Sequence, residues 1–254
     1  MINSKPENGT KKDNIKAVVL LSGGLDSAIA AQLVIDQGIE VFALNFHSAF
    51  CTCEGNNKTY GCGAINFARK MDIPIKSVTK SNDYFKIIQH PKFGYGRHLN
   101  PCIDCRIHIL KQAKVYMEEI GAEFVITGEV LGQRPKSQTI NALKVIEKNS
   151  GLKGKILRPL SAQLLEPTEM EKKGLIDRKK LLNIKGRRRN LQVELGRNYN
   201  LIKEYCAAGG CRLTEKHYAN KLRDYLKFTN SPNMGDMKFL SIGRHFQIND
   251  IKFI

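Results

Sequence analysis

The sequence predicts an α/β fold in which helices cover both faces of a doubly wound parallel sheet, followed by a small α+β C-terminal module. Short apolar runs alternate with segments of helical periodicity, as in repeated strand–helix units. The runs cover residues 17–21, 40–46, 73–78 and 124–127. Polar or glycine-rich turns follow several of them, and in such folds ligands bind at the carboxyl ends of the strands.

The first apolar run leads into residues 22–27, which read Ser-Gly-Gly-Leu-Asp-Ser. Two glycines, Gly23 and Gly24, let the backbone approach a phosphate, and free N–H groups at the start of the following helix point toward an anion. Ser22 and Ser27 add hydroxyl donors, and we expect Asp26 or Ser27 to cap the helix. Asp26 suits a phosphate site once Mg²⁺ is included, because a carboxylate can hold this ion against pyrophosphate. No Gly-Lys-Ser/Thr follows, so the loop is not of the Walker type.

The later elements follow in order. A second strand ends at Phe46, a helix covers 64–71, and a third strand covers 73–78. Asn100 and Pro101 open a long helix that runs to residue 120, and a fourth strand ends at Gly128 and Glu129. Because parallel strands end at one edge of the sheet, we expect Phe46 and Gly128 to lie beside the nucleotide. Further on, the pattern predicts a helix from Thr214 to about 226 and strands at 237–242 and 251–254.

Composition points to a polyanionic partner. The 254 residues include 41 Lys and Arg against 24 Asp and Glu, a net charge of +17. Nucleic acid is the commonest partner for such an excess. Nine of the basic residues fall between 172 and 190, where Asp177 is the one acid. This stretch, with its peak at Arg187, Arg188 and Arg189, is either a solvated face or a contact with RNA.

The chain divides into four predicted parts. Residues 1–15 are polar and form a disordered tail. Residues 16–165 form the nucleotide-binding domain, 166–205 a basic connecting segment, and 206–254 the C-terminal module. No secretory signal or membrane-spanning stretch is visible, so we expect a cytoplasmic protein without membrane contact.

Seven cysteines in a cytoplasmic chain need a reason other than structural disulfides. Cys102 and Cys105 fall three residues apart in the first turn of a helix, whose N-terminus stabilises thiolates. This C-x-x-C pair suits a redox site, half of a zinc site or half of an iron–sulfur site. Cys211, which follows two glycines, is the best third ligand, and three cysteines leave one iron of a cubane cluster open to bind sulfide. We interpret Cys51, Cys53 and Cys62 as thiols of a mobile loop rather than a second metal site, and Cys206 as a small buried residue.

Three motifs resemble the PP-loop tRNA thiolation family, which includes enzymes of the ThiI, MnmA and TtuA kinds. They are residues 22–27, 100–105 and 128–138, the last reading Gly-Glu-Val-Leu-Gly-Gln-Arg-Pro-Lys-Ser-Gln. MnmA-type enzymes have Asp at the first position of the C-x-x-C motif, whereas this chain has Cys at both. That departure implies the cluster-dependent, TtuA-like branch. The stretch 209–214, together with 243–246, resembles a small RNA-binding module of the NFACT-R kind.

The resemblance implies an ATP-dependent tRNA sulfurtransferase, in which ATP adenylates a base carbonyl and sulfur then replaces the oxygen. The implied cofactors are ATP, Mg²⁺ and a 4Fe–4S cluster, and the implied partners are tRNA and a sulfur donor, either sulfide or a persulfide carrier. A homodimer is one candidate assembly. The alternatives are a cluster-free route, in which Cys105 attacks and Cys211 carries a persulfide, a PP-loop ligase that adenylates a small molecule, and a non-catalytic RNA-binding protein.

The implied site residues form four groups. The catalytic group is Asp26, Cys105 and Cys211, and the metal ligands are Cys102, Cys105 and Cys211. The ATP-binding group comprises Ser22, Gly23, Gly24, Asp26, Ser27, Phe46 and Gly128. The RNA-binding group comprises Arg134, Lys136, Arg187, Arg188 and Arg189.

Overall fold

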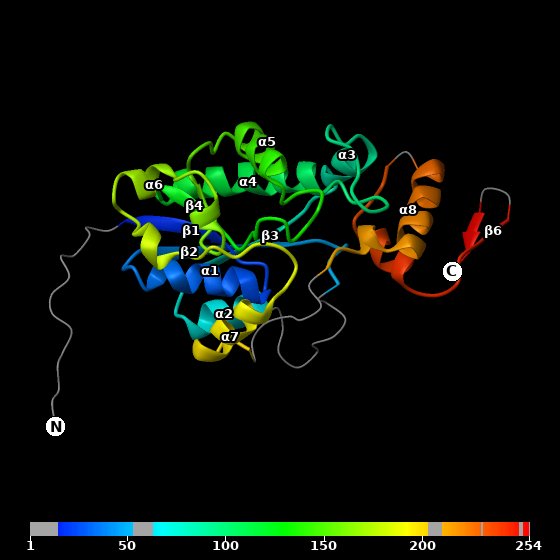
Figure 1. The fold of residues 1–254 in the computed structure, drawn as a ribbon. Coiled ribbons are helices and arrows are strands. Elements are labelled where there is room, and N and C mark those ends of the chain that lie inside the picture. The colour runs from blue at the N-terminus through cyan, green and yellow to red at the C-terminus, as the bar shows by residue number, and fades with distance from the viewer. Residues whose placement is uncertain (1–14, 53–62, 203–209, 230, 249–250, 254) are drawn as a thin grey trace, which may run out of the picture.

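Five parallel strands form the central sheet of the computed structural model (Figure 1), which describes residues 15–52, 63–202, 210–229, 231–248 and 251–253. The predicted tail therefore lies, except for Ile15, outside the described residues. The sheet has the order β3-β2-β1-β4-β5. Its strands are β1 (Lys16–Leu20), β2 (Glu40–His47), β3 (Ile75–Thr79), β4 (Phe124–Thr127) and β5 (Ile156–Leu157). The predicted parallel α/β fold is confirmed.

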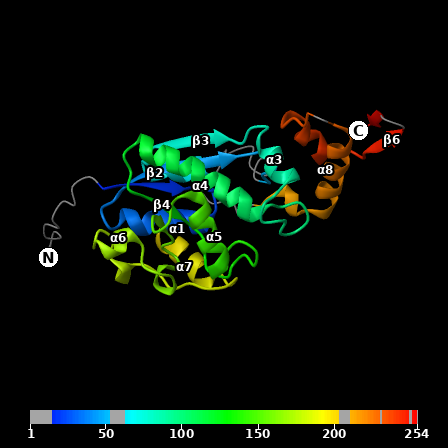
Figure 2. The same cartoon turned by 90° about the horizontal axis from the view of Figure 1, so that it is seen from above.

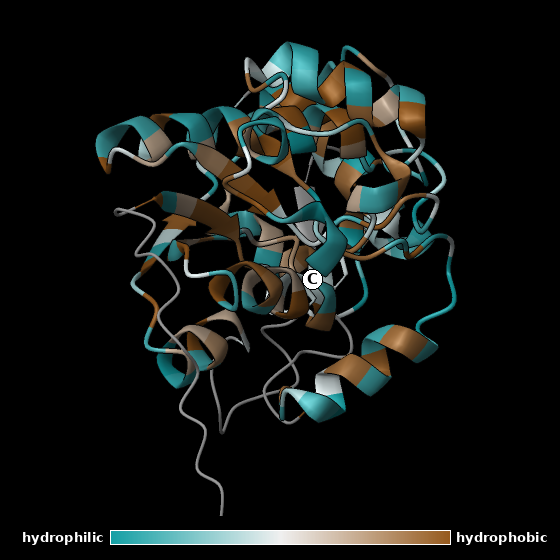
Figure 3. Ribbon diagram, turned by 60° about the vertical axis from the view of Figure 1, so that its left-hand side comes forward, coloured by the Kyte–Doolittle hydropathy of each residue, from teal (hydrophilic) through white to brown (hydrophobic). Residues whose placement is uncertain are grey.

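Helices cover both faces of this sheet (Figures 1 and 2). One face carries α1 (Leu25–Ile35), α2 (Gly63–Lys70) and α7 (Asn190–Asn198), and the other carries α4 (Cys102–Glu119) and α5 (Ile140–Ser150). Each face has its own cluster of buried apolar residues. The strands themselves are coloured hydrophobic in Figure 3, as expected for a parallel sheet that is covered on both sides. Short elements complete this part of the chain: α3 (Tyr84–Gln89), η2 (Ala162–Leu164), α6 (Glu169–Lys172) and η3 (Arg178–Lys180).

The strand order places a ligand site between β1 and β4. From β1 the chain moves outward to β2 and β3, and it then returns to β4 on the other side of β1. The connections from β1 and β4 consequently run in opposite directions, and this reversal opens a crevice at their carboxyl ends. The predicted nucleotide loop follows β1, and the motif at 128–138 follows β4. Both predicted motifs therefore border this crevice.

The segment predicted to connect the two domains packs into the main core. Met170, Ile176, Leu181 and Ile184 are buried in the same apolar cluster as α1 and α2. Helix α7 also lies against α1 (Figure 1). In packing terms, residues 166–202 are thus part of the α/β core, while the domain boundaries themselves stay a prediction.

The C-terminal region contains η4 (Arg212–Thr214), α8 (Lys216–Phe228), η5 (Gly235–Ser241) and an antiparallel pair, β6 (Phe246–Ile248) and β7 (Ile251–Phe253). The strand predicted at 237–242 is wrong. Met237 and Leu240 are buried three residues apart in a 3₁₀ helix, which is the spacing of one 3₁₀ turn. Thr214 lies in η4 and donates a hydrogen bond to the Cys211 carbonyl (2.7 Å), so it does not cap α8, which begins at Lys216. No helix within the described ranges is both long and apolar enough to cross a membrane.

Candidate functional site

The loop after β1 is organised by its two serines. The Ser27 hydroxyl donates to the Gly24 carbonyl (2.8 Å) and lies 3.1 Å from the Ser22 hydroxyl, which accepts a bond from the Gly24 N–H (3.3 Å). Gly23 has a φ of +77°, a left-handed conformation that favours glycine. The helix begins at Leu25, two or three residues earlier than predicted, so its N-cap is Gly24 rather than Asp26 or Ser27, and no side chain caps it. Asp26 and Ser27 therefore lie in the first turn, and the uncapped start of α1 is suited to bind an anion.

Gly128 brings the end of β4 against this helix turn. A Cβ atom at position 128 would lie 2.5 Å from the Ser27 N atom and 2.6 Å from the Asp26 carbonyl carbon. Only glycine permits this approach of two backbones. Phe46, at the end of β2, is half-buried and packs against the apolar cluster under α4. Its contact with ATP stays a prediction.

The Asp26 carboxylate is contacted from two distant parts of the chain. Gln133 Nε2 donates to Asp26 Oδ2 (3.0 Å), and Arg189 Nη2 lies 3.4 Å from Asp26 Oδ1. Gln133 lies in the predicted motif at 128–138 but is not among the predicted site residues, and Arg189 is predicted to contact RNA. The structure places both at the nucleotide loop. Arg187 and Arg188 are exposed, as a surface contact requires.

Cys105 lies in a second group of residues, near the end of β3. Lys80 Nζ lies 3.1 Å from Cys105 Sγ and 4.2 Å from the centre of the Tyr84 ring. Burial opposes ionisation of the Cys105 thiol, but Lys80, a hydrogen bond from Tyr84 and the nearby Arg106 outweigh it, so the pKa of this thiol falls below its usual value. Lys80 was not predicted from the sequence, although it follows a strand at the ligand-binding edge of the sheet. Cys105 is therefore the thiol of the group that ionises most readily, and its catalytic role stays a prediction.

Cys211 joins this group through a short pairing with Cys51. The Thr52 N–H donates to the Gly210 carbonyl (3.3 Å) and the Arg212 N–H to the Phe50 carbonyl (2.8 Å), so Cys51 and Cys211 form a non-hydrogen-bonded antiparallel pair. Burial raises the pKa of the Cys211 thiol to about 11, and the neighbouring Cys105 adds to this effect. Cys211 is thus a thiol that ionises far less readily than the neighbouring Cys105.

The structure brings the three predicted metal ligands near one another. Within the described ranges, no three His, Cys, Asp or Glu side chains are grouped closely enough to hold a metal ion, and this includes Cys102, Cys105 and Cys211. Burial, opposed by Ser137 and Lys136, raises the pKa of the Cys102 thiol. The assignment of these three cysteines as cluster ligands therefore stays a prediction. Cys53, Cys62 and Cys206 lie outside the described residues.

The loop at 128–138 connects the two groups. Glu129 is buried and ion-paired with Arg106 on α4 (3.0 Å) and with Arg158 after β5 (3.0 Å). Although burial opposes ionisation, these two arginines lower the pKa of the Glu129 carboxyl, so this link weakens only as the pH falls through that lowered pKa. Gln133 in the same loop reaches Asp26, while Arg134 and Lys136 are exposed and lie within electrostatic range of the Cys102 thiol.

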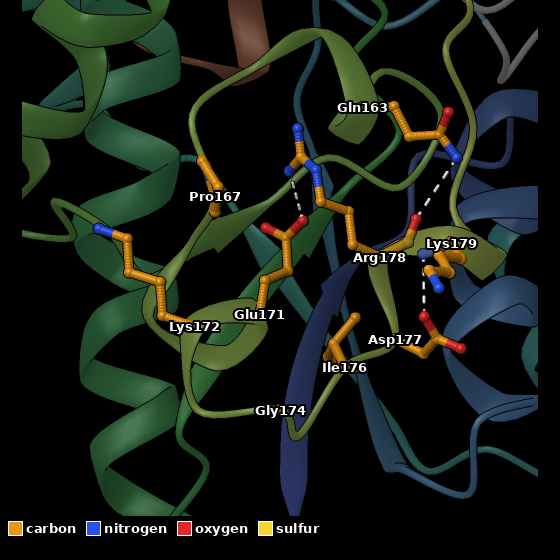
Figure 4. A pocket seen from close by; sticks show the side chains of 9 residues that line it. All are labelled: Gln163, Pro167, Glu171, Lys172, Gly174, Ile176, Asp177, Arg178 and Lys179. Atoms are coloured by element: carbon orange, nitrogen blue, oxygen red, sulfur yellow. Dashed lines mark hydrogen bonds and ion pairs between the residues drawn. The ribbon is translucent and has the colours of Figure 1, made fainter.

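A separate open depression of 890 Å³ lies beside α6 and η3 (Figure 4). It contains none of the predicted site residues. Its most prominent cation, Arg178, is ion-paired with Glu171 (2.6 Å), and the Lys179 N–H donates to Asp177 (2.9 Å). Because its lining shares no residue with the nucleotide loop or the thiol group, the depression is distinct from the candidate site.

The fold, the Ser-Gly-Gly-Leu-Asp-Ser loop and the neighbouring thiols together define a PP-loop protein of the tRNA thiolation class. A family model described as thiamine biosynthesis protein ThiI matches residues 13–165, which is more than half of the chain, and the chain belongs to this ThiI family. The match ends before the C-terminal region, whose resemblance to an NFACT-R module stays a prediction.

The similar proteins include tRNA sulfurtransferases and a tRNA thiouridylase. A probable tRNA sulfurtransferase of Thermococcus kodakarensis is 29% identical over 146 residues, covering 57% of this chain and 36% of that protein. The tRNA-specific 2-thiouridylase MnmA of Clostridium beijerinckii is 35% identical over 129 residues, covering 44% of this chain and 35% of that protein. The chain thus spans little more than a third of the length of these relatives. A solved 4-thiouridine synthetase in complex with RNA and ATP has 22% identity and a TM-score of 0.45, covering 89% of this chain and 52% of that one.

The pairing of Cys51 with Cys211 leads to a testable prediction. Residues in a non-hydrogen-bonded antiparallel pair have Cα atoms about 4.5 Å apart, within the range that a disulfide spans. We expect mild oxidation to join Cys51 and Cys211 in preference to Cys102 and Cys105, and non-reducing peptide mass spectrometry checks this. The variant Cys51→Ser serves as the control. A dominant Cys102–Cys105 disulfide in the wild-type chain would contradict the pairing.

Proposed function

We propose that this chain catalyses ATP-dependent thiolation of a uridine or cytidine base in tRNA. The observation that carries the proposal is that the loop at 128–138 lies next to both the nucleotide loop and the cysteines. Gln133 contacts the Asp26 carboxylate of the nucleotide loop, while Arg134 and Lys136 lie beside the cysteines. A base held at this loop has the nucleotide on one side and the thiols on the other. The names of the relatives support the same reaction.

The first step is adenylation of the base. ATP lies at the carboxyl edge between β1 and β4 with its phosphates at the uncapped start of α1. The base carbonyl oxygen attacks the α-phosphorus, and the bond to the β-phosphate oxygen breaks, so that pyrophosphate leaves with the electron pair. N–H groups of residues 23–27 stabilise the charge that develops on the leaving group. A Mg²⁺ ion bound by Asp26 would supply further positive charge there.

The second step is sulfur transfer, for which Cys105, the thiol whose pKa is lowered, is the best-suited group. In the cluster-free route, Cys211 carries a persulfide delivered by a persulfide donor. The Cys105 thiolate attacks the Cys211 sulfur, a disulfide forms between them, and the hydrosulfide released attacks the activated base carbon as AMP leaves. A thiol reductant restores the two thiols. Exposed cations at Arg134, Lys136, Arg187 and Arg188 would contact the tRNA backbone.

The experiment that tests this proposal combines purified protein with ATP, Mg²⁺, bulk unmodified tRNA and either sulfide or a persulfide donor. We expect one thiolated nucleoside by mass spectrometry, together with AMP and pyrophosphate. Asp26→Ala should lower pyrophosphate release by about 100-fold, since the carboxylate that would hold Mg²⁺ against the leaving pyrophosphate is lost. AMP formation with a small-molecule acceptor, and no thionucleoside, would instead identify a ligase of the PP-loop type.

Iron analysis decides between the two sulfur routes. In the cluster-free route, anaerobically purified protein thiolates tRNA without iron when a persulfide donor is present. Stoichiometric iron and sulfide, lost in Cys102→Ala together with thiolation, would show that a 4Fe–4S cluster is required. A cytoplasmic location and a homodimer stay predictions.

A further inference from the structure

Arg189 belongs to the basic segment, but its side chain turns toward the nucleotide loop. Arg189 Nη2 lies 3.4 Å from Asp26 Oδ1, whereas Arg187 and Arg188 beside it are exposed. Its own side chain is 41% exposed, against 17% for Asp26. Of the three consecutive arginines, it is Arg189 that the structure places next to a site residue.

The fold fixes this position from both directions along the chain. On the N-terminal side, the Gly186 N–H donates to the Leu131 carbonyl (2.7 Å) and Lys185 pairs with Leu131 in a parallel bridge, so this stretch lies beside the loop that follows β4. On the C-terminal side, α7 begins at residue 190 and packs on α1. Gly196 allows that contact, because a Cβ atom there would lie 2.7 Å from Leu25 Cδ1. Arg189 is therefore held between two fixed contacts. One is with the loop that follows β4, and the other is with α1, which begins at the nucleotide loop.

The guanidinium of Arg189 also has unused hydrogen-bonding capacity. Its Nε atom is buried and has no hydrogen-bond partner among the described residues. A buried donor without a partner is costly, and a ligand that accepts from it recovers that cost. The Nε and Nη2 atoms of an arginine form the fork that binds two oxygens of a phosphate. The arrangement thus offers a phosphate two donors, one of which now faces Asp26.

We propose that Arg189 binds the β- and γ-phosphates of ATP and stabilises the departing pyrophosphate. This rests on the proposed function, since it assigns a further residue to the same adenylation step. In the structure, Asp26 balances the charge of Arg189. When nucleotide occupies the loop, the phosphate oxygens accept hydrogen bonds from Arg189 Nε and Nη2. The Asp26 carboxylate then no longer pairs with Arg189 and is free to hold the Mg²⁺ ion that accompanies ATP. As the bond between the α-phosphorus and the β-phosphate oxygen breaks, the electron pair stays on pyrophosphate, and Arg189 faces that added charge.

The test compares the affinities of the full chain for ATP and AMP, measured without tRNA. Arg189→Ala should weaken ATP binding at least about 10-fold, as expected for loss of a charged hydrogen-bond partner, and leave AMP binding unchanged. Arg189→Lys keeps the charge but loses the two-donor fork of the guanidinium, so its ATP affinity should lie between those of the wild-type chain and Arg189→Ala. Arg197→Ala removes a charge from the exposed last turn of α7 and serves as the matched control, with ATP affinity unchanged.

Two results would overturn the assignment. Unchanged ATP affinity in Arg189→Ala, with weaker tRNA binding, would return this residue to the RNA-binding surface. An equal loss of ATP and AMP affinity would indicate a structural role. Because the affinities for ATP and AMP are measured without tRNA or a sulfur donor, a failure of tRNA thiolation would leave the test of Arg189 unchanged.

Discussion

Replacing Cys105 with serine is expected to abolish formation of the thionucleoside while ATP is still cleaved to AMP. The serine hydroxyl is similar in size to the thiol, but it is neither ionised near neutral pH nor able to attack a persulfide sulfur. The nucleotide loop lies on a different strand end, so adenylation should continue at a similar rate. Nucleoside mass spectrometry and AMP release, measured in the same reaction, check both halves of the prediction. Loss of AMP release together with thiolation would show that the two steps share this residue.

The reactivity of Cys105 should depend on pH in a particular direction. Its lowered pKa keeps the thiolate populated at a lower pH than for a free cysteine, and alkylation slows as the pH falls through that lowered pKa. Cys211, with its pKa raised to about 11, should stay unmodified at pH 8. Lys80→Met removes the nearest positive charge and should slow alkylation of Cys105 at pH 8 by several-fold. Lys86→Met, an exposed lysine paired with Asp83, is the matched control. An unchanged rate in Lys80→Met would show that Lys80 does not set this pKa.

Replacing Gly128 with alanine is the second change for which we expect a large effect. The added methyl group would meet backbone atoms of Asp26 and Ser27 at 2.5–2.6 Å, and backbone cannot move aside as a side-chain tip can. Overpacking of this kind costs about 1–3 kcal/mol, which for a chain of this size lowers the melting temperature by about 2–12 °C. Because the displaced atoms belong to the phosphate-binding turn, ATP affinity should fall more than stability alone predicts. Thermal denaturation with and without ATP measures both effects.

A control separates this clash from the general effect of losing a glycine. Gly235 has no positive φ, and a Cβ atom there would meet only the side chain of Asn233, at 3.3 Å. Gly235→Ala should therefore leave both the melting temperature and the ATP affinity close to the wild-type values. If Gly128→Ala behaved in the same way, the close approach of β4 to α1 would not be required for the site.

The elements of the sheet and the nucleotide loop could be predicted because their determinants are local. Apolar runs, the two glycines and the polar residues at the strand ends lie within a few residues of one another, and the chain order of strands and helices limits the topology. The 3₁₀ helix at 235–241 shows where this fails. Residues 237–242 contain apolar positions that suit either a strand or a tight helix, and burial of Met237 and Leu240 decides between the two.

The partners within the site could not be predicted in the same way. Gln133 and Arg189 reach Asp26 across 107 and 163 residues of sequence, and Cys51 pairs with Cys211 through the backbone of a loop. Such contacts depend on the packing of α7 on α1 and on the docking of residues 210–213. Composition assigned Arg189 to RNA because a run of three arginines gives no indication of which side chain turns inward. Lys80 is the exception, since a cation just after a predicted strand could have been selected by position.

The docking of residues 210–213 has a consequence for how the protein matures. Leu213 is buried with Phe50 and Leu99, and the Leu99 N–H donates to its carbonyl (3.1 Å). A growing chain acquires its structure from the N-terminal end onward, so the residues of the nucleotide loop leave the ribosome well before Cys211 does. Until the late segment arrives, Phe50, Tyr84 and Leu99 lack the apolar residues that cover them. Cys105 and Cys211 are consequently the last residues of the proposed site to come together, and a chain interrupted before residue 210 would contain the nucleotide loop without the thiol pair.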